Sequence, residues 1–199
     1  ELAFSGLGLN PVTATPPNRH DAALVPGGSS SGAATSVAFG LASVAIGSDT
    51  GGSVRNPAAW NDLVGLKTTL GRVPVKGAVP LVESMDTIGP LARTVEDAAL
   101  ALALIEGGVA ADLNGATLVG KRLLVLADYA DSSRDAPRAA FKHAVERFKA
   151  AGAIIERAEI AAVGKAMDLT PLLFAPEGYA IWRDVIEASP HLMFDRILE

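Results

Sequence analysis

The chain has 199 residues, of which 49% are hydrophobic and 20% charged, so it can bury a core and is not a disordered polypeptide. Its formal net charge of −5 argues against the basic face that nucleic-acid binding requires and against a polybasic membrane anchor. It has no cysteine, which excludes disulfide scaffolds and thiolate chemistry, and only 3 histidines, which argues against a histidine metal cluster. The longest apolar run covers residues 98–105, whereas a membrane-spanning helix needs about 20 residues.

The first part of the chain is expected to be rich in loops, because prolines and glycines are frequent throughout residues 1–93. Residues 33–41 predict a helix of small side chains, since apolar residues recur there at spacings of three and four. Residues 43–47 predict a short, buried strand. Thr94 begins a capping box at the start of a further helix, and Gly107 marks its end.

The remainder alternates regularly between strands and helices. Residues 122–127 form a continuous apolar run typical of a strand inside a parallel sheet. Residues 135–151 predict an amphipathic helix, and residues 153–158 predict the next strand, which gives a βαβ unit. Residues 167–188 look helical, with a break expected at Pro176. This alternation predicts an α/β protein with three α/β/α layers.

Two segments combine serine with glycine at the edges of predicted elements. The first tract is Pro26-Gly-Gly-Ser-Ser-Ser-Gly32, and the second is Gly47-Ser-Asp-Thr-Gly-Gly-Ser53. Glycine lets backbone N–H groups converge into a pocket for negative charge. A serine in such a pocket can attack a carbonyl while the N–H groups hold the developing oxyanion. The serine needs a base, which could be a histidine, a neutral lysine, or a second serine that relays to such a lysine.

The first tract also has other interpretations. It could be a flexible turn, although the second tract at this distance makes that a weak reading. A phosphate-binding loop would need lysine after the last glycine, and Ala33 stands there instead. The tract formally matches the G-x-S-x-G nucleophile elbow with Ser30 at its centre. That reading needs a downstream histidine, and His143 and His191 are the available ones, while His20 precedes the serine.

The spacing of the two tracts and the residues around them are specific. The first tract continues through Ala34, and Ser53 closes the second tract 24 residues after Ser29, followed by Val-Arg55. In this combination the sequence resembles the amidase signature family. Further matching segments lie at residues 1–8, 64–68, 71–73 and 86–93. The resemblance is dense over residues 1–107, moderate over 119–160 and loose after residue 165.

The resemblance implies a fold and a set of site residues. The fold is a three-layer α/β/α arrangement around a central mixed sheet, with residues 1–199 as a single amidase-signature domain. Ser53 would be the nucleophile and Ser29 the relay serine, with the Gly28–Ser29 peptide bond in the cis form. The oxyanion would be held by the backbone N–H groups of Thr50, Gly51, Gly52 and Ser53. Three residues would brace the site: Ser30, Asp49 and Arg55.

The implied chemistry is acyl transfer. A neutral lysine would draw a proton from Ser29, Ser29 would take one from Ser53, and Ser53 would attack the amide carbonyl. In the family this lysine precedes the segment that matches residues 1–8, which we name the lead-in segment. None of the six lysines here precedes Ser29 or lies on an equivalent segment. Because the chain also begins with Glu1 rather than Met, we interpret it as an internal fragment, incomplete at the N-terminus and at the C-terminus. The 199-residue piece alone is expected to be inactive.

The expected function is hydrolysis of a small carboxylic amide to a carboxylate and ammonia or an amine. The resemblance implies no cofactor, no metal and a cytoplasmic location, and it leaves a homodimer open. The net charge and the short apolar runs argue against nucleic-acid contact and membrane association. One alternative is the A subunit of a tRNA-dependent amidotransferase, which releases ammonia from glutamine. Another alternative, prompted by the missing lysine, is a non-catalytic scaffold or binding domain with a vestigial site.

Overall fold

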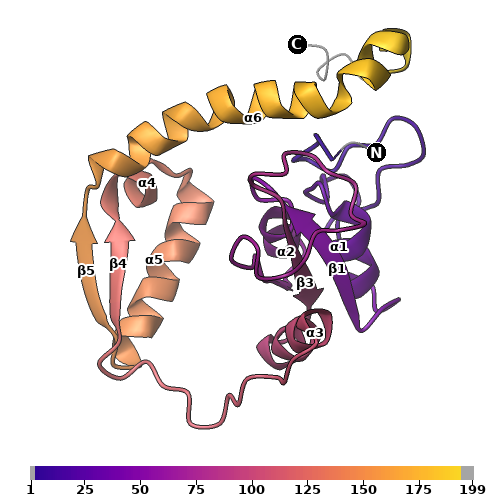
Figure 1. Cartoon of the computed structure of the whole chain (residues 1–199). Helices are drawn as coiled ribbons and strands as arrows, with labels where there is room; N and C mark the ends of the chain where they lie inside the picture. The colour runs from indigo at the N-terminus through magenta and orange to yellow at the C-terminus, as the bar shows by residue number, and fades with distance from the viewer. Residues whose placement is uncertain (1–2, 194–199) are drawn as a thin grey trace. The chain divides into compact units, whose positions relative to one another are not determined.

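The computed structural model describes residues 3–193 and divides the chain into two compact units (Figure 1). One unit comprises residues 1–112 and 174–199, and the other comprises residues 113–173. Each unit has its own sheet, antiparallel in the first and parallel in the second. The mixed α/β class predicted from the sequence is thereby confirmed, while the single domain over residues 1–199 stays a prediction.

The first unit is built on a three-stranded antiparallel sheet in the order β1-β3-β2. Its strands are β1 (Val44–Asp49), β2 (Val64–Gly65) and β3 (Thr87–Ala92). Its helices include α1 (Ser31–Ala38), α2 (Arg55–Trp60) and α3 (Val95–Glu106). In the register of the sheet, Asp49 at the end of β1 pairs with Thr87 at the start of β3. This pairing places the end of β1 and the start of β3 together at one end of the sheet, where the second tract lies.

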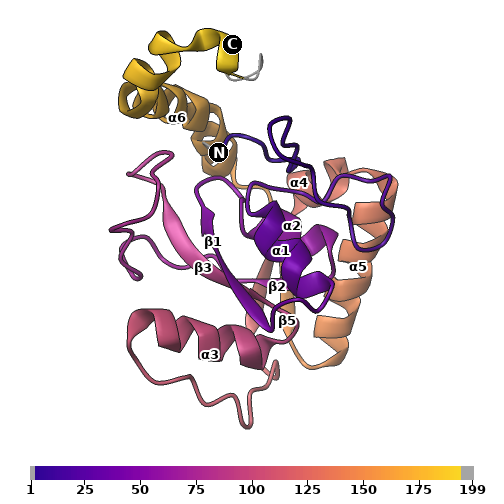
Figure 2. The same cartoon turned by 90° about the vertical axis from the view of Figure 1, so that its right-hand side faces the viewer.

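The core of this unit lies where α1 and α2 pack on the sheet (Figure 2). Its cluster consists of Ala34, Val54, Ala58 and Leu91, none of which is more than 1% exposed. Small side chains on α1 and α2 allow both helices to approach the sheet closely. Burial of the two larger side chains contributes about 1.5–3 kcal/mol each. The two helices that follow the Gly/Ser tracts are therefore fixed against the same sheet, α1 on β1 and β3, and α2 on β2.

Helix α3 begins and ends as its sequence predicts. The Thr94 side chain accepts a hydrogen bond from the backbone N–H of Asp97 at 3.0 Å, which satisfies one of the free amides of the first turn. Gly107 follows the last helical residue with φ of 70°, the left-handed conformation that terminates many helices.

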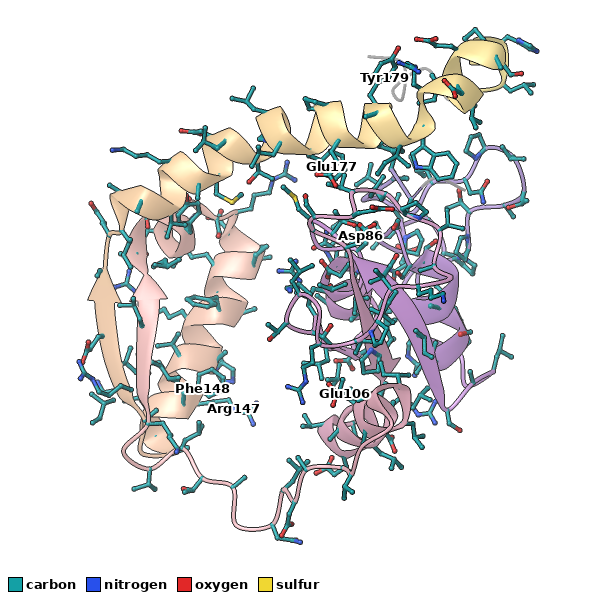
Figure 3. All side chains as sticks on the ribbon, in the orientation of Figure 1. Asp86, Glu106, Arg147, Phe148, Glu177 and Tyr179 are labelled. Carbon is teal, nitrogen blue, oxygen red and sulfur yellow. The ribbon has the colours of Figure 1, made fainter. Side chains whose placement is uncertain are left out.

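The second unit contains the predicted βαβ arrangement. Strands β4 (Arg122–Leu126) and β5 (Ile154–Ala158) pair in parallel, with α4 (Ala127–Ser132) and α5 (Asp135–Ala150) between them in the chain. The apolar stripe of α5 is only partly covered, since Phe141 is 45% exposed and Phe148 is 42% exposed. Figure 3 shows Phe148 on this helix.

Helix α6 corrects one expectation. It runs without interruption over Ala161–Ala188, although a break was expected at Pro176; a short 3-10 helix, η1 (Pro190–Leu192), follows it. Proline costs a helix about 3 kcal/mol, because it lacks an N–H group and crowds the preceding turn. Beyond Pro176 the helix makes a long-range contact, since the indole N–H of Trp182 donates to the carbonyl oxygen of Pro80 at 2.9 Å.

Candidate active site

The second tract forms a tight loop at the end of β1, organised by the carboxylate of Asp49. This side chain is 1% exposed and accepts hydrogen bonds from the backbone N–H groups of Gly52 (2.8 Å), Val54 (3.1 Å) and Arg55 (3.2 Å). The Arg55 guanidinium donates two more, from Nε at 3.0 Å and Nη2 at 2.8 Å. One buried carboxylate thus fixes the backbone on both sides of Ser53.

The environment of Asp49 keeps it ionised. Burial alone would raise the pKa of Asp49, but the hydrogen bonds from Arg55 and from the Val54 and Gly52 amides outweigh burial and lower the pKa below its usual value. The same contact with Asp49 raises the pKa of the Arg55 guanidinium. Both residues were expected to brace the site, and these contacts give that expectation a physical basis.

The first tract is held against the lead-in segment by backbone contacts. Gly27 N–H donates to the Leu7 carbonyl at 3.1 Å, and Gly28 N–H donates to the Gly6 carbonyl at 2.9 Å. A Cβ atom on Gly28 would lie 2.2 Å from the carbonyl oxygen of Ser5, so the approach of the two segments requires glycine here. The next peptide bond, Gly28–Ser29, is cis. Ser29 follows it and is half-buried.

The two tracts meet through Ser30. Its backbone N–H donates to the carbonyl oxygen of Ser53 at 3.1 Å, and its hydroxyl donates to the carbonyl oxygen of Ser48 at 3.2 Å. A Cβ atom on Gly47 would lie 2.5 Å from the Ser30 hydroxyl oxygen, so β1 and the first tract are closely packed. The fold therefore brings the Ser29-Ser30 segment next to Ser53, although 24 positions separate Ser29 from Ser53 in the sequence.

The four amides expected to hold an oxyanion differ in their surroundings. The Gly52 N–H donates to Oδ1 of Asp49, and its expected part in an oxyanion hole stays a prediction. Within residues 3–193, no acceptor is found for the N–H groups of Gly51 and Ser53. The Thr50 side chain is tied to another carboxylate, that of Asp86. The backbone N–H of Thr50 likewise has no acceptor among the described residues, so the oxyanion-binding part of Thr50, Gly51 and Ser53 stays a prediction.

A pocket of about 870 Å³ adjoins the first tract. Ser29 and its two following serines form part of its wall, together with residues 3–12 and the apolar side chains of Val185, Leu192 and Met193. Among the described residues that line this pocket, none carries a charged side chain. An ionised group would lose its hydration there without a partner, so the pocket suits an uncharged group.

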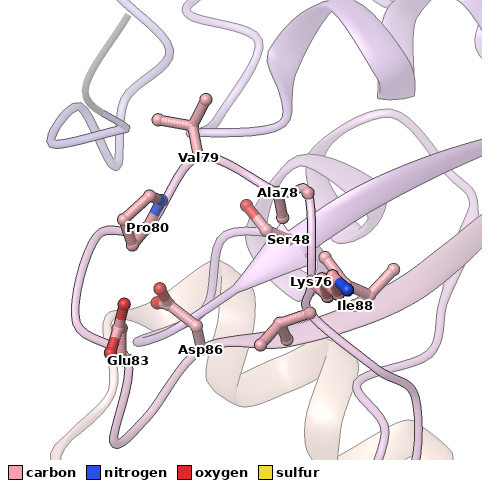
Figure 4. A pocket seen from close by; sticks show the side chains of 10 residues that line it. Ser48, Lys76, Ala78, Val79, Pro80, Glu83, Asp86 and Ile88 are labelled. Atoms are coloured by element: carbon pink, nitrogen blue, oxygen red, sulfur yellow. The ribbon is translucent and has the colours of Figure 1, made fainter.

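Two contacts of the second tract were missed by sequence reasoning. The Thr87 hydroxyl donates to the carbonyl oxygen of Asp49 at 2.7 Å, and the Thr50 hydroxyl donates to the carboxylate of Asp86. Residues 86–93 belong to the resembling segments, but no local pattern indicates a bond between positions 36 apart. Asp86 also lines a second pocket, of about 460 Å³, with Ser48, Lys76 and Glu83 (Figure 4).

No base for Ser29 is found among the described side chains. All six lysines lie within residues 3–193, and none of them is hydrogen-bonded to Ser29 or Ser53. The nucleophile-elbow reading has no support in the geometry, because the Ser30 hydroxyl donates to a backbone carbonyl and no histidine in this part of the chain accepts from it.

The comparisons with known proteins decide the family. The model of the family described as Amidase matches residues 1–194. This chain belongs to the amidase family. The resemblance inferred from the two tracts is confirmed. Among residues 3–193 of this family member, no helix is both long enough and apolar enough to span a membrane.

Similar proteins include enzymes with different reactions. The 2-amino-5-chloromuconic acid deaminase of Comamonas testosteroni is 53% identical over 111 residues, which is 53% of this chain and 23% of the relative. The A subunit of the glutamyl-tRNA(Gln) amidotransferase of Enterococcus faecalis is 43% identical over 158 residues, which is 72% of this chain and 32% of the relative. The chain thus spans about a quarter to a third of the length of these relatives.

The solved structures agree with this family. A crystal structure of an amidase superimposes with a TM-score of 0.86 at 30% identity, covering 96% of this chain and 43% of that one. The A subunit of the Thermotoga maritima glutamyl-tRNA(Gln) amidotransferase gives 0.83 at 27% identity, with 96% and 48% covered. The peptide amidase of Stenotrophomonas maltophilia gives 0.73 at 33% identity, with 93% and 41% covered.

Proposed function

We propose that this chain carries the nucleophile and oxyanion-binding part of a serine amidohydrolase. The Ser53 hydroxyl oxygen bonds to the amide carbonyl carbon, and its proton passes to Ser29. The C–N bond then breaks, and the leaving ammonia or amine takes the proton back through Ser29. Water hydrolyses the resulting ester by the same route and gives a carboxylate. A neutral lysine, as the family resemblance implies, is expected to deprotonate Ser29.

One observation supports this function most strongly. The Ser30–Ser53 backbone bond of 3.1 Å holds the relay segment beside a serine whose loop amides are oriented by a buried carboxylate. The amides of Gly51 and Ser53 can donate to the carbonyl oxygen as it gains negative charge, which is worth several kcal/mol in known hydrolases. A structural turn would not require the two tracts to lie side by side, whereas a serine hydrolase of this kind would.

Replacement of Ser53 by alanine tests this function. In the full-length chain, Ser53→Ala should lower kcat for amide hydrolysis about 10³-fold or more, because the variant cannot form the acyl-enzyme. Ser36→Ala is the matched control, since the Ser36 hydroxyl donates to the Ala33 carbonyl within α1 and lies outside the site. Undiminished turnover by Ser53→Ala would rule out the proposed nucleophile.

We further place an uncharged part of the substrate in the pocket beside Ser29. Among the described residues that line this pocket, none carries a charged side chain, which favours a neutral aliphatic amide over an anionic one. Hexanamide should therefore have a higher kcat/KM than succinamate, which carries a carboxylate where hexanamide has part of its alkyl chain. A preference for succinamate would place the substrate elsewhere.

Membership of an amidotransferase complex is the second candidate. It is supported by the 43% identity to the A subunit from Enterococcus faecalis and by the fold match to the A subunit from Thermotoga maritima. In that case the full-length chain would release ammonia from glutamine and co-purify with a second protein in the cytoplasm. Hydrolysis of simple amides without a partner would favour the stand-alone amidase. A homodimer has no observation in its favour and remains an expectation from the sequence.

The vestigial scaffold is the third alternative. A fluorophosphonate labels only an activated serine, so reaction at Ser53 in the full-length chain would exclude a vestigial site. The isolated 199-residue chain is expected to hydrolyse no amide, because no described lysine reaches Ser29.

A further inference from the structure

The loop between residues 81 and 86, which we name the buttress loop, contacts the second tract from outside the predicted site. We propose that Asp86, at the end of this loop, is a positioning residue that holds the oxyanion-binding backbone through Thr50. This role rests on the proposed function, because it concerns the same transition-state oxygen.

Asp86 is a buried carboxylate whose oxygens accept several hydrogen bonds. It is 7% exposed, and its oxygens accept hydrogen bonds from the backbone N–H groups of Leu81 (2.8 Å) and Val82 (3.2 Å). Among the described residues, no cation forms an ion pair with it. Its charge is therefore balanced by amides of its own loop and by the Thr50 hydroxyl, which gives a charge-assisted bond.

The hydrogen bond between Thr50 and Asp86 lies at the start of the loop that carries the amides predicted to hold the oxyanion. Thr50 lies between Asp49 and Gly51, and the N–H of Gly51 has no acceptor within residues 3–193. The Asp49 carboxylate fixes the backbone from Gly52 onward, so it leaves the Thr50–Gly51 peptide unconstrained from that side. The Asp86 bond supplies this second constraint. Without it the peptide can rotate, and the Gly51 N–H loses its direction.

The buttress loop is itself anchored to α6. Glu177 accepts hydrogen bonds from the backbone N–H and the hydroxyl of Ser84, and Trp182 donates to the carbonyl of Pro80, the residue just before the loop. Figure 3 shows Glu177 on α6 and Asp86 below it. These hydrogen bonds attach the buttress loop to α6. The position of Asp86 is thus defined independently of the loop that it holds.

A positioning role predicts a particular kinetic pattern in the full-length chain. Thr50→Val removes the hydroxyl at constant volume, and Asp86→Asn removes the charge. Each should lower kcat about 10- to 100-fold with KM within about 2-fold, because misdirected amides weaken transition-state binding more than substrate binding. The double variant should be no slower than the slower single variant, and Thr50→Ser should restore kcat to within about 3-fold.

The control is Glu83→Gln, which removes an exposed carboxylate from the same loop and should leave kcat unchanged. If Asp86→Asn does not fold, as judged by circular dichroism, the Thr50→Val and Thr50→Ser pair decides alone. Additive effects, a rise in KM at constant kcat, or an undiminished rate for Thr50→Val would overturn the role of Asp86. Loss of activity in Ser53→Ala together with any of these results leaves the proposed function intact, whereas an active Ser53→Ala variant refutes the function itself.

Discussion

Substitution of Asp49 by asparagine is expected to destabilise the first unit by about 1–4 kcal/mol. Asparagine keeps the shape but replaces one acceptor oxygen by an NH₂ group. Oδ1 accepts from Gly52 N–H and Arg55 Nη2, whereas Oδ2 accepts from two backbone amides and Arg55 Nε. The nitrogen will therefore take the Oδ1 position, where fewer amides lose their acceptor. Because the buried Gly52 N–H then has no acceptor, the free energy of unfolding falls by about 1–3 kcal/mol. The half-exposed Arg55 pair adds about 0–1 kcal/mol, because water screens it.

Urea unfolding of the 199-residue chain, followed by circular dichroism, measures this difference. The exposed Asp168→Asn change on α6 is the matched control and should stay within about 0.5 kcal/mol of the parent. Since the folded-state pKa of Asp49 lies below the ordinary value of 3.8, its stabilisation is complete above that pH. It is lost as the pH falls further, through the pKa of the folded state. A difference below about 0.5 kcal/mol at pH 7, or one that persists unchanged at the lowest pH, would refute this reasoning.

Two further predictions concern the packing around the site. Gly47→Ala should lower the free energy of unfolding in urea by about 1–3 kcal/mol, because its Cβ atom would lie 2.5 Å from the Ser30 hydroxyl oxygen. The control is Gly51→Ala, where nothing lies within 4 Å of the added Cβ atom and a smaller loss of stability is expected. Equal losses in the two variants would contradict this prediction. The hydrogen bonds from Ser84 lower the pKa of Glu177, so their contribution is present above the ordinary value of 4.5 and disappears as the pH falls through the folded-state pKa. Unfolding of Glu177→Gln should therefore differ from the parent at neutral pH and converge with it in acid, and a difference independent of pH would argue against this contact.

Capping residues and hydrophobic spacing predicted those helices whose position is determined by residues close together in the sequence. Thr94 and Gly107 bound α3 as expected, because caps act within one turn of the helix. The small-residue helix was also predicted, although it begins at Ser31 rather than Ala33. The break expected at Pro176 was wrong: α6 continues through it, and the helix beyond it contacts Pro80, about a hundred positions away in the sequence, through Trp182, which a local preference does not take into account.

The candidate site was predictable only in part. The two tracts indicated a serine and an anion-binding backbone, but only the family resemblance paired Ser29 with Ser53. The link between Thr50 and Asp86 could not be predicted, since it depends on how the turn before β3 is folded. Periodicity and capping carry no information on such a contact.

Activation of Ser53 as the nucleophile is the central claim, and covalent labelling tests it most directly. The full-length chain should be treated with a fluorophosphonate, digested and analysed by peptide mass spectrometry. We expect one phosphonylated serine, Ser53, with labelling abolished in Ser53→Ala and slowed in Ser29→Ala. A label on Ser30 or another serine, or full amide hydrolysis by a chain that takes up no label, would contradict it.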